Sequence, residues 1–397
     1  MSAPTRTALL RQAPRLRALW LARSISFTGD GVSQVALVLL TARHGSSAVG
    51  LVLLAGTLPY LLGPLAGALA DRFELRRLMI ACNLGQALGI GVLAVSSPAL
   101  PVLLLLVAAV ALLAAVFGPA GKSCLPELVP AELLPRANAV MGTASNMQIL
   151  AGPALGGVLV GLGGSRLAFA LDAASFLACA ALLSRLPRLR VDSVSGEGVW
   201  ASTRAGLRFT ARTPPARALA LGTFVFVAFA AMDNVALVFL VRRALHGSQV
   251  EYGITVAAFG AGLLLGVLAL ARWAGRWSPQ RWLLAGVLSG AVGAAATGFA
   301  PTPAAAMLAQ AVGGVGNSCD VVATDTLVQQ LVPRPLLGRV FGSIATAAQL
   351  GAAVAYAMAA PLVATVGARV TFVIAAAGML VGLLALTPVL RSGRAAS

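Results

Sequence analysis

The sequence predicts an all-α membrane protein with twelve transmembrane helices in two pseudo-symmetric halves of six. Three observations predict this fold: an apolar composition, regularly spaced apolar runs, and arginines that gather between alternate runs. Of the 397 residues, 59% are hydrophobic and 10% are charged, whereas a soluble domain carries about 25% charged residues. A chain this apolar cannot cover a water-exposed surface with polar groups. The lipid bilayer is therefore its expected solvent.

The apolar runs have the length that a membrane span requires. A helix needs about 20 apolar residues to cross a bilayer. Turn signals such as Gly163-Gly164-Ser165 and Ala300-Pro301-Thr302-Pro303 separate the runs. We predict spans at 17–42, 47–70, 77–97, 100–121, 137–162, 165–186, 216–241, 251–271, 280–299, 302–324, 339–364 and 367–390.

The distribution of basic residues predicts the orientation. Cytoplasmic loops of membrane proteins are rich in Lys and Arg. With the N-terminus in the cytoplasm, most basic residues fall on the cytoplasmic side, and the first span contains Arg23. The opposite side holds only Arg43, Arg166, Arg242, Arg243 and Arg369. We therefore predict a multi-pass protein of the bacterial plasma (inner) membrane, with both termini cytoplasmic. The net charge of +17 reflects this topology, and no nucleic acid is expected as a partner.

An internal repeat divides the chain. Leu128-Val129-Pro130 recurs as Leu331-Val332-Pro333, and at the same separation Arg136 matches Arg339. Parallel repeats of this kind place a substrate site between two halves near the membrane midplane. We predict an N-terminal half at 1–186, a cytoplasmic linker at 187–215 and a C-terminal half at 216–397.

The loop after the second predicted span reads G-A-L-A-D-R-F-E-L-R-R-L, from Gly67 to Leu78. It resembles the signature loop of the major facilitator superfamily, G-x-L-A-D-R-x-G-R-K, although Glu74 replaces the usual glycine. The resemblance implies a gate in which Asp71 meets the positive end of a helix that begins near Arg339. A charge run that serves only topology is the alternative. The matching residues that would form the gate loop are Gly67, Asp71, Arg72, Arg76 and Arg77.

The fifth predicted span carries G-P-A-L-G-G, which resembles the antiporter motif of the same superfamily. In that family the motif is associated with proton-coupled export. Position 148 departs from the pattern, because Gln148 stands where the family has glycine. Generic packing of small residues between helices is the alternative. The motif residues are Gly152, Pro153, Gly156 and Gly157.

Longer segments resemble one branch of the superfamily. R-A-L-W-L-A-R-S-I-S-F-T-G-D in the first span and L-D-A-A-S-F in the sixth are similar to macrolide and enterobactin efflux proteins. The resemblance implies an antiporter, which is expected to be a monomer. It would export small amphiphilic compounds, as in multidrug resistance, in exchange for protons. The sequence shows no nucleophile–base constellation, so neither enzyme activity nor a cofactor is expected. An importer, a lipid flippase or an exporter of one metabolite has the same fold, and a non-transporting membrane sensor is a further alternative.

Two acidic residues inside spans are the predicted proton-coupling residues. Asp30 lies near the middle of the first span, with Arg23 and Gln34 on the same helical stripe. Asp233 occupies the equivalent position in the second half. Ionisable groups inside a membrane usually face a cavity or a partner. Either acid can therefore carry a proton. The alternative is a permanent ion pair, for instance of Asp30 with Arg23, or a hydrogen bond to the backbone.

Three further acids have structural roles as their expected function. Asp172, near Ser175, is expected to accept structural hydrogen bonds. Asp320 and Asp325 are expected to form gate salt bridges with basic residues such as Arg136 and Arg339. Four scattered cysteines are expected to pack as small apolar side chains. At these spacings they and the two histidines do not form a usual zinc site, so no metal site is expected. The cysteines are Cys82, Cys124, Cys179 and Cys319.

Overall fold

The computed structural model describes residues 10, 13–63, 65, 73–187, 199–273, 276–333 and 336–392. These residues form helices and connecting turns, with no strand among them. The elements in chain order are α2 (Pro14–Thr41), η1 (Ala42–His44), α3 (Ser46–Thr57), η2 (Leu58–Leu62), α5 (Leu75–Val95), α6 (Leu100–Ser123), η3 (Ala131–Leu133), α7 (Leu134–Ile149), α8 (Ala151–Leu183), α9 (Val199–Arg212), α10 (Pro214–Ala230), α11 (Asp233–Phe239), the π-helix η4 (Leu240–Ala244), α12 (Gln249–Arg272), α13 (Pro279–Phe299), α14 (Pro303–Leu331) and α15 (Leu337–Ser392).

Eight helical stretches within these described ranges are long and apolar enough to cross a membrane. Two of them, Leu134–Leu183 and Leu337–Leu390, contain 50 and 54 residues. Each of the two is interrupted by a glycine with positive φ, Gly164 at 73° and Gly367 at 81°. The predicted all-helical membrane fold is confirmed, and Gly164 lies in one of the predicted turns. The number of twelve spans stays a prediction.

Polar caps set where several helices of the C-terminal part begin. Ser248 and Glu251 form a capping box at the start of α12. The hydroxyl groups of Ser278 and Thr302 accept hydrogen bonds from the first turns of α13 and α14. Both helices have proline in the first turn, where the missing N–H costs no helical hydrogen bond. The Thr302-Pro303 turn signal therefore marks a helix start.

The helices group into two compact units. The first contains Met1–Leu37 and Leu62–Gly196, and the second contains Val38–Leu61 and Glu197–Ser397. The segment Val38–Leu61 joins the second unit because α3 packs on α15, where the Ser46 hydroxyl donates to the Ala360 carbonyl at 2.7 Å. The predicted division at the linker 187–215 stays a prediction.

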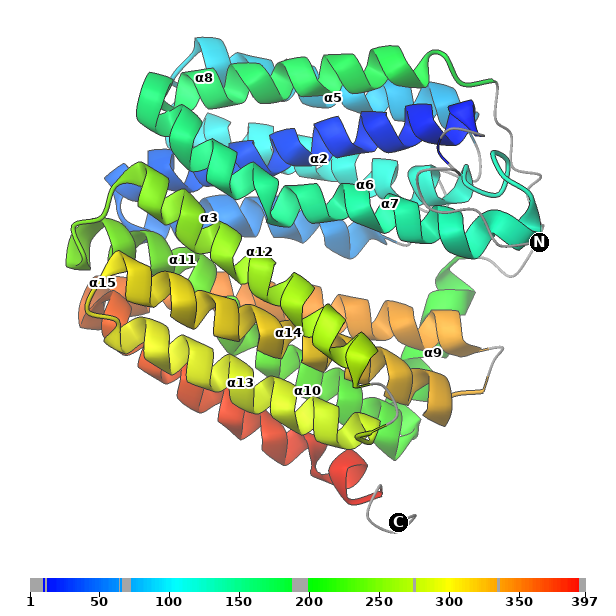
Figure 1. Cartoon of the computed structure of the whole chain (residues 1–397), viewed down its shortest axis with the longest axis vertical. Coiled ribbons are helices and arrows are strands. Elements are labelled where there is room, and N and C mark those ends of the chain that lie inside the picture. The colour runs from blue at the N-terminus through cyan, green and yellow to red at the C-terminus, as the bar shows by residue number, and fades with distance from the viewer. Residues whose placement is uncertain are drawn as a thin grey trace. The chain divides into compact units, whose positions relative to one another are not determined.

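The first unit has an apolar core where α2, α5, α6 and α8 meet. In Figure 1, α5 and α8 lie side by side, and their residues are in contact. The core residues share almost complete burial; among them are Leu16, Leu19, Leu75, Met79, Phe117, Leu183 and the three cysteines Cys82, Cys124 and Cys179. These cysteines therefore pack as small apolar side chains, as the sequence predicted.

The second unit is arranged around two helices with several neighbours. The helix α14 packs against both α12 and α13, and α15 packs against α10, α11 and α13 (Figure 1). The short helix α9, from the predicted linker, packs on α10 and α15. There, Gly206 lies against the backbone of Arg339. The predicted linker is thus partly a packed helix.

Candidate functional site

Asp30 lies in the middle of α2, and its side chain is partly exposed. Directly beside it, α2 packs closely on α8. A Cβ added to Gly152 would lie 2.7 Å from the Cα of Gly31, and one added to Gly31 would lie 2.9 Å from the Cα of Gly152. In real proteins a Cβ atom essentially never lies within 3.0 Å of a heavy atom to which it is not bonded. The two helices therefore meet backbone to backbone one residue away from Asp30.

Asp172 of α8 faces the same part of α2. Its side chain is 1% exposed, and it accepts hydrogen bonds from the hydroxyls of Ser33 and, at 3.1 Å, of Ser175. A Cβ on Gly29 would overlap the Asp172 carboxyl, so this carboxyl lies against the backbone that precedes Asp30. The hydrogen-bonding role predicted for Asp172 is confirmed.

The sequence did not predict that Asp172 belongs to the surroundings of Asp30. The spacing of Asp172 and Ser175 on one helix was a visible signal for their hydrogen bond. The contact with Ser33 joins two helices, and the sequence contains no pattern that pairs these positions. The structure thus places Asp172, with its hydrogen-bond donors Ser33 and Ser175, in the neighbourhood of Asp30.

Removing the Ser33 hydroxyl is expected to lower the stability of the first unit. In Ser33→Ala the buried Asp172 carboxyl loses one of its two hydroxyl donors, at a cost of about 1 kcal/mol in the free energy of unfolding. Equilibrium unfolding in mixed micelles measures this change. The control is Ser145→Ala, because the exposed Ser145 hydroxyl donates only to the carbonyl of Gly142 on its own helix. Equal stability of the two variants would contradict this assignment.

Arg23 is buried in the first unit, at 8% exposure. Its guanidinium lies over the rings of Phe27 and Phe117, at 4.9 and 5.2 Å from their centroids. The structure describes both Arg23 and Asp30 and shows no ion pair between them, with 4.0 Å as the limit. No direct salt bridge is therefore seen between the two, and the choice between a proton carrier and an ion pair stays a prediction. Gln34, the third residue of the predicted stripe, is exposed.

Asp233 lies at the break between the helices α10 and α11 of the second unit. The helix α10 ends at Ala230, and α11 begins at Asp233 itself. The side-chain amide of Gln310 donates to the Asp233 carboxyl at 3.1 Å, and Gln310 is buried. The neighbouring Asn234 donates to the Tyr356 hydroxyl at 3.4 Å. Interrupted helices are where transporters commonly bind substrate and ions.

Sequence reasoning did not identify Gln310 or Tyr356 as site residues. A signal for Gln310 was present, because it is an amide within an otherwise apolar run of α14. Amides inside spans often bond to another helix. The sequence did not show which helix, and the structure shows that the partner is Asp233.

The predicted antiporter motif lies entirely in α8, and its four residues are buried. One turn after Gly152, an added Cβ on Gly156 would lie 3.0 Å from the carbonyl oxygen of Val32. Pro153 has no N–H and so leaves the carbonyl of Ile149 without its helical partner. The chain leaves regular helix next to this position, at Leu150, between α7 and α8. The motif therefore allows both the close packing on α2 and a break in the helix.

The predicted gate loop is only partly described. Gly67, Asp71 and Arg72 lie outside the described residues. Arg76 donates to the Leu186 carbonyl at 2.8 Å, and Arg77 lies 3.6 Å from the Glu74 carboxylate. Glu74 also accepts a hydrogen bond from the backbone N–H of Arg77 and so caps α5. The residue that departs from the family pattern thus has a local role as a helix cap.

The predicted gate salt bridges stay predictions. Asp320 is 7% exposed in α14 and packs against Gly286 of α13, whereas Asp325 is exposed. Arg136 is partly exposed in the first unit, and Arg339 is partly exposed in the second. Within the described residues there is also no group of three or more His, Cys, Asp or Glu side chains arranged to hold a metal ion.

Known sequences resemble this chain over most of its length. The family model described as transmembrane secretion effector matches residues 5–395. The multidrug efflux pump Tap of Mycolicibacterium fortuitum is 29% identical over 365 residues, which cover 87% of this chain and 88% of Tap. The enterobactin exporter EntS of Salmonella typhimurium is 27% identical over 343 residues, which cover 84% of this chain and 82% of EntS.

Solved transporters share the fold. The nucleoside transporter NupG superposes with a TM-score of 0.80 at 12% identity, covering 94% of this chain and 98% of NupG. A bacterial homolog of the human lysosomal transporter Spinster, in an inward-facing and unoccupied conformation, gives a TM-score of 0.75 at 17% identity, with 98% of each chain covered. At these identities the likeness concerns the fold alone.

The all-helical fold and these similarities define a multi-pass membrane transporter of the major facilitator type, not an enzyme. The chain belongs to the transmembrane secretion effector family. The resemblance to the efflux branch, which the sequence motifs carried, is confirmed by the similarity to Tap and EntS.

Proposed function

We propose that this protein is a proton-coupled exporter of small amphiphilic compounds, and that its two six-helix halves alternate access to a central site. The observation that carries the proposal is the contact of Gly31 with Gly152. It joins the antiporter-motif helix to the helix of Asp30 next to that acid. A shift of α8 against α2 would therefore change the surroundings of both Asp30 and Asp172. Such a shift is a physical means to couple proton binding to helix movement.

The curated relatives support export as the direction. Tap is named a multidrug efflux pump, and EntS is named an enterobactin exporter. We propose varied amphiphiles, drugs among them, as substrates of this chain. The similarity to EntS favours a second candidate, the export of one secreted metabolite. An importer, a lipid flippase and a non-transporting sensor remain outcomes of the test below.

The count of twelve spans is part of the proposal. Eight stretches of the described chain qualify as spans by length and hydropathy. Division at Gly164 and at Gly367 turns two of them into four. The apolar segment Ser46–Leu62 and the 29-residue helix α14 supply the remaining two. Helices of 50 or more residues would exceed a bilayer of about 30 Å more than twofold, because each residue adds about 1.5 Å.

We propose a monomer in the bacterial inner membrane, with both termini in the cytoplasm, as the arginine distribution predicts. Asp71 and Arg72 belong to the cytoplasmic gate. The pairs formed by Asp320 or Asp325 with Arg136 or Arg339 would hold that gate closed in one of the two alternating states.

Export should depend on a proton gradient. In inverted vesicles from an efflux-deficient host that expresses the protein, an interior made acidic should drive the accumulation of ethidium or of a lipophilic macrolide, and a protonophore should abolish it. The same host should become resistant to at least one compound of a lipophilic panel. No resistance to any compound, together with measured uptake of a nutrient, would favour an importer and contradict the proposal.

A further inference from the structure

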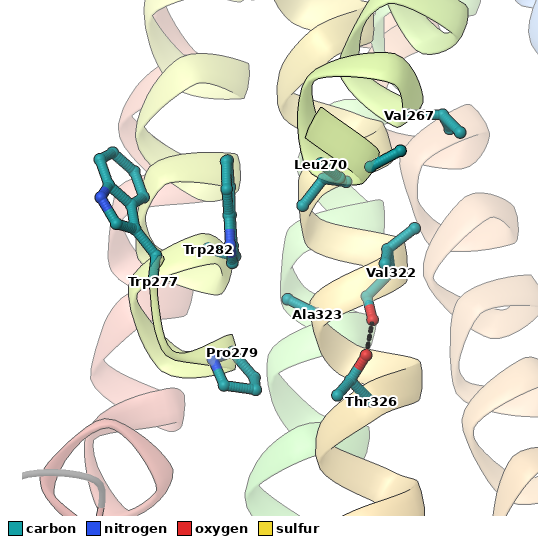
Figure 2. Close-up of a pocket in the computed structure, with 9 residues that line it drawn as sticks. Val267, Leu270, Trp277, Pro279, Trp282, Val322, Ala323 and Thr326 are labelled. Atoms are coloured by element: carbon teal, nitrogen blue, oxygen red, sulfur yellow. Dashed lines mark hydrogen bonds between the residues drawn. The ribbon is translucent and has the colours of Figure 1, made fainter. Parts of the chain in front are cut away.

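The second unit contains an apolar pocket between α12 and α13, with α14 as its floor (Figure 2). Its volume is about 410 Å³. Leu270 lies on one side, Trp282 on the other, and Val322 and Ala323 below. The Thr326 hydroxyl donates to the Val322 carbonyl of its own helix at 2.7 Å, as the dashed line in Figure 2 shows. This hydroxyl is therefore satisfied, and the pocket wall presents apolar surface.

The pocket exists because close packing on α14 ends before the helices do. A Cβ on Gly266 of α12 would lie 2.9 Å from the Val315 carbonyl oxygen, and a Cβ on Gly286 of α13 would lie 2.6 Å from the Asp320 nitrogen. At these glycines both helices lie directly on α14. Nearer the connection between α12 and α13, the side chains are large, as at Leu270 and Trp282, and they hold a groove open.

Two tryptophans line the pocket, and three arginines lie close to its lining residues in the chain. The rings of Trp277 and Trp282 lie 4.8 Å apart between centroids, and Trp277 is 49% exposed. Arg272, Arg276 and Arg281 are exposed around the same turn, and none of them forms an ion pair with another residue that the structure describes. Tryptophan is typical of the membrane–water interface. The pocket thus combines an apolar interior with a tryptophan pair typical of the interface, and the exposed arginines belong to the adjacent ends of α12 and α13 and to the turn between them.

We propose that this pocket binds an anionic glycerophospholipid, with one acyl chain between α12 and α13 and its phosphate beside the three arginines. Guanidinium groups bind phosphate through paired N–H donors. Basic pockets between transmembrane helices are known to bind anionic headgroups on the cytoplasmic side. The arginine distribution predicts that this end of the helices faces the cytoplasm. Charge complementarity therefore selects an anionic lipid over a zwitterionic one.

The tryptophans provide a direct test. In a Trp20→Phe/Trp200→Phe variant, the three remaining of the five tryptophans are Trp273, Trp277 and Trp282. The protein is placed in phosphatidylcholine nanodiscs that contain a minor fraction of lipid with brominated acyl chains, which quench tryptophan on contact. Brominated phosphatidylglycerol should quench the tryptophan fluorescence to a given extent at a lower lipid fraction than brominated phosphatidylcholine. The difference in lipid fraction should be on the order of tenfold.

Two sets of variants test whether the preference for phosphatidylglycerol over phosphatidylcholine arises at this pocket. Arg272→Gln/Arg276→Gln/Arg281→Gln should abolish it, and Ala323→Phe should weaken it by filling the pocket. The matched control Arg204→Gln/Arg208→Gln/Arg212→Gln removes as many exposed charges from α9 and should retain it. Equal quenching by the two lipids would overturn the proposal, even if the triple variants do not fold. A preference that survives the change at Arg272, Arg276 and Arg281 would also overturn it.

Discussion

Asp30→Asn is expected to abolish proton-driven export and to leave the transporter folded. A coupling acid must bind a proton in one state and release it in the other. Asparagine has the same size as aspartate and can still form hydrogen bonds, but its amide can neither bind nor release the coupling proton. In inverted vesicles with an acidic interior, ethidium accumulation should therefore fall to the level of vesicles without the protein. Equilibration of ethidium down its own gradient should continue, which distinguishes an uncoupled transporter from an unfolded one.

The control for this variant is Glu127→Gln, which neutralises an exposed acid of the same unit and should leave accumulation unchanged. Asp233→Asn tests the repeat-related acid. Its neighbour Gln310 can still bond to asparagine, so the fold should persist while coupling weakens. Unchanged proton-driven accumulation in both Asp30→Asn and Asp233→Asn would rule out these acids as proton carriers.

The second large effect is expected for Gly152→Ala. The new methyl group would lie 2.7 Å from the Cα of Gly31 and 2.9 Å from the Thr28 carbonyl oxygen. Both are backbone atoms, so relief requires α8 to move away from α2. Overpacking of this kind costs about 1–3 kcal/mol, and two close backbone contacts place the cost above the gain of about 1 kcal/mol in helix propensity that Ala has over Gly. The melting temperature in detergent should fall, and export should fall with it.

Gly142→Ala on α7 is the matched control, because a Cβ at Gly142 has no neighbouring atom within 4 Å. At this position only the gain in helix propensity of Ala over Gly applies, so the melting temperature should stay the same or rise. If the two alanine variants were equally stable and equally active, the close contact of Gly31 and Gly152 would have no role in folding or in transport.

The two acids differ in how much of their surroundings the sequence predicted. Asp30 and Asp233 were found by composition and repeat, because a charge inside an apolar run and a shared offset are visible in one dimension. Their partners were not found. Ser33 and Asp172 lie on different helices, as do Gln310 and Asp233. Which faces of two helices meet depends on side-chain packing, which leaves no periodic signal in either segment.

The helices, like the acids, have features that the sequence predicted and features that only tertiary contacts determined. Apolar runs of about 20 residues predict spans because a bilayer has a fixed thickness, and Gly164 was predicted as a turn because Gly163-Gly164-Ser165 separates two such runs. The placement of Val38–Leu61 in the second unit had no such basis. It depends on contacts of α3 with α15, such as the bond from Ser46 to Ala360, between segments far apart in the chain.

The sequence by itself determined the solvent of this protein, its helical class, its family motifs and the two membrane acids. Each of these follows from local composition or spacing. A lipid environment requires apolar helices, and a charged residue inside a span is costly and therefore rare. Only the tertiary structure decided that Arg23 packs over Phe27 and Phe117, that Asp172 faces the helix of Asp30, and that Gly31 meets Gly152. These facts depend on how close the backbones of separate helices come, and this distance is set by all the side chains between them at once.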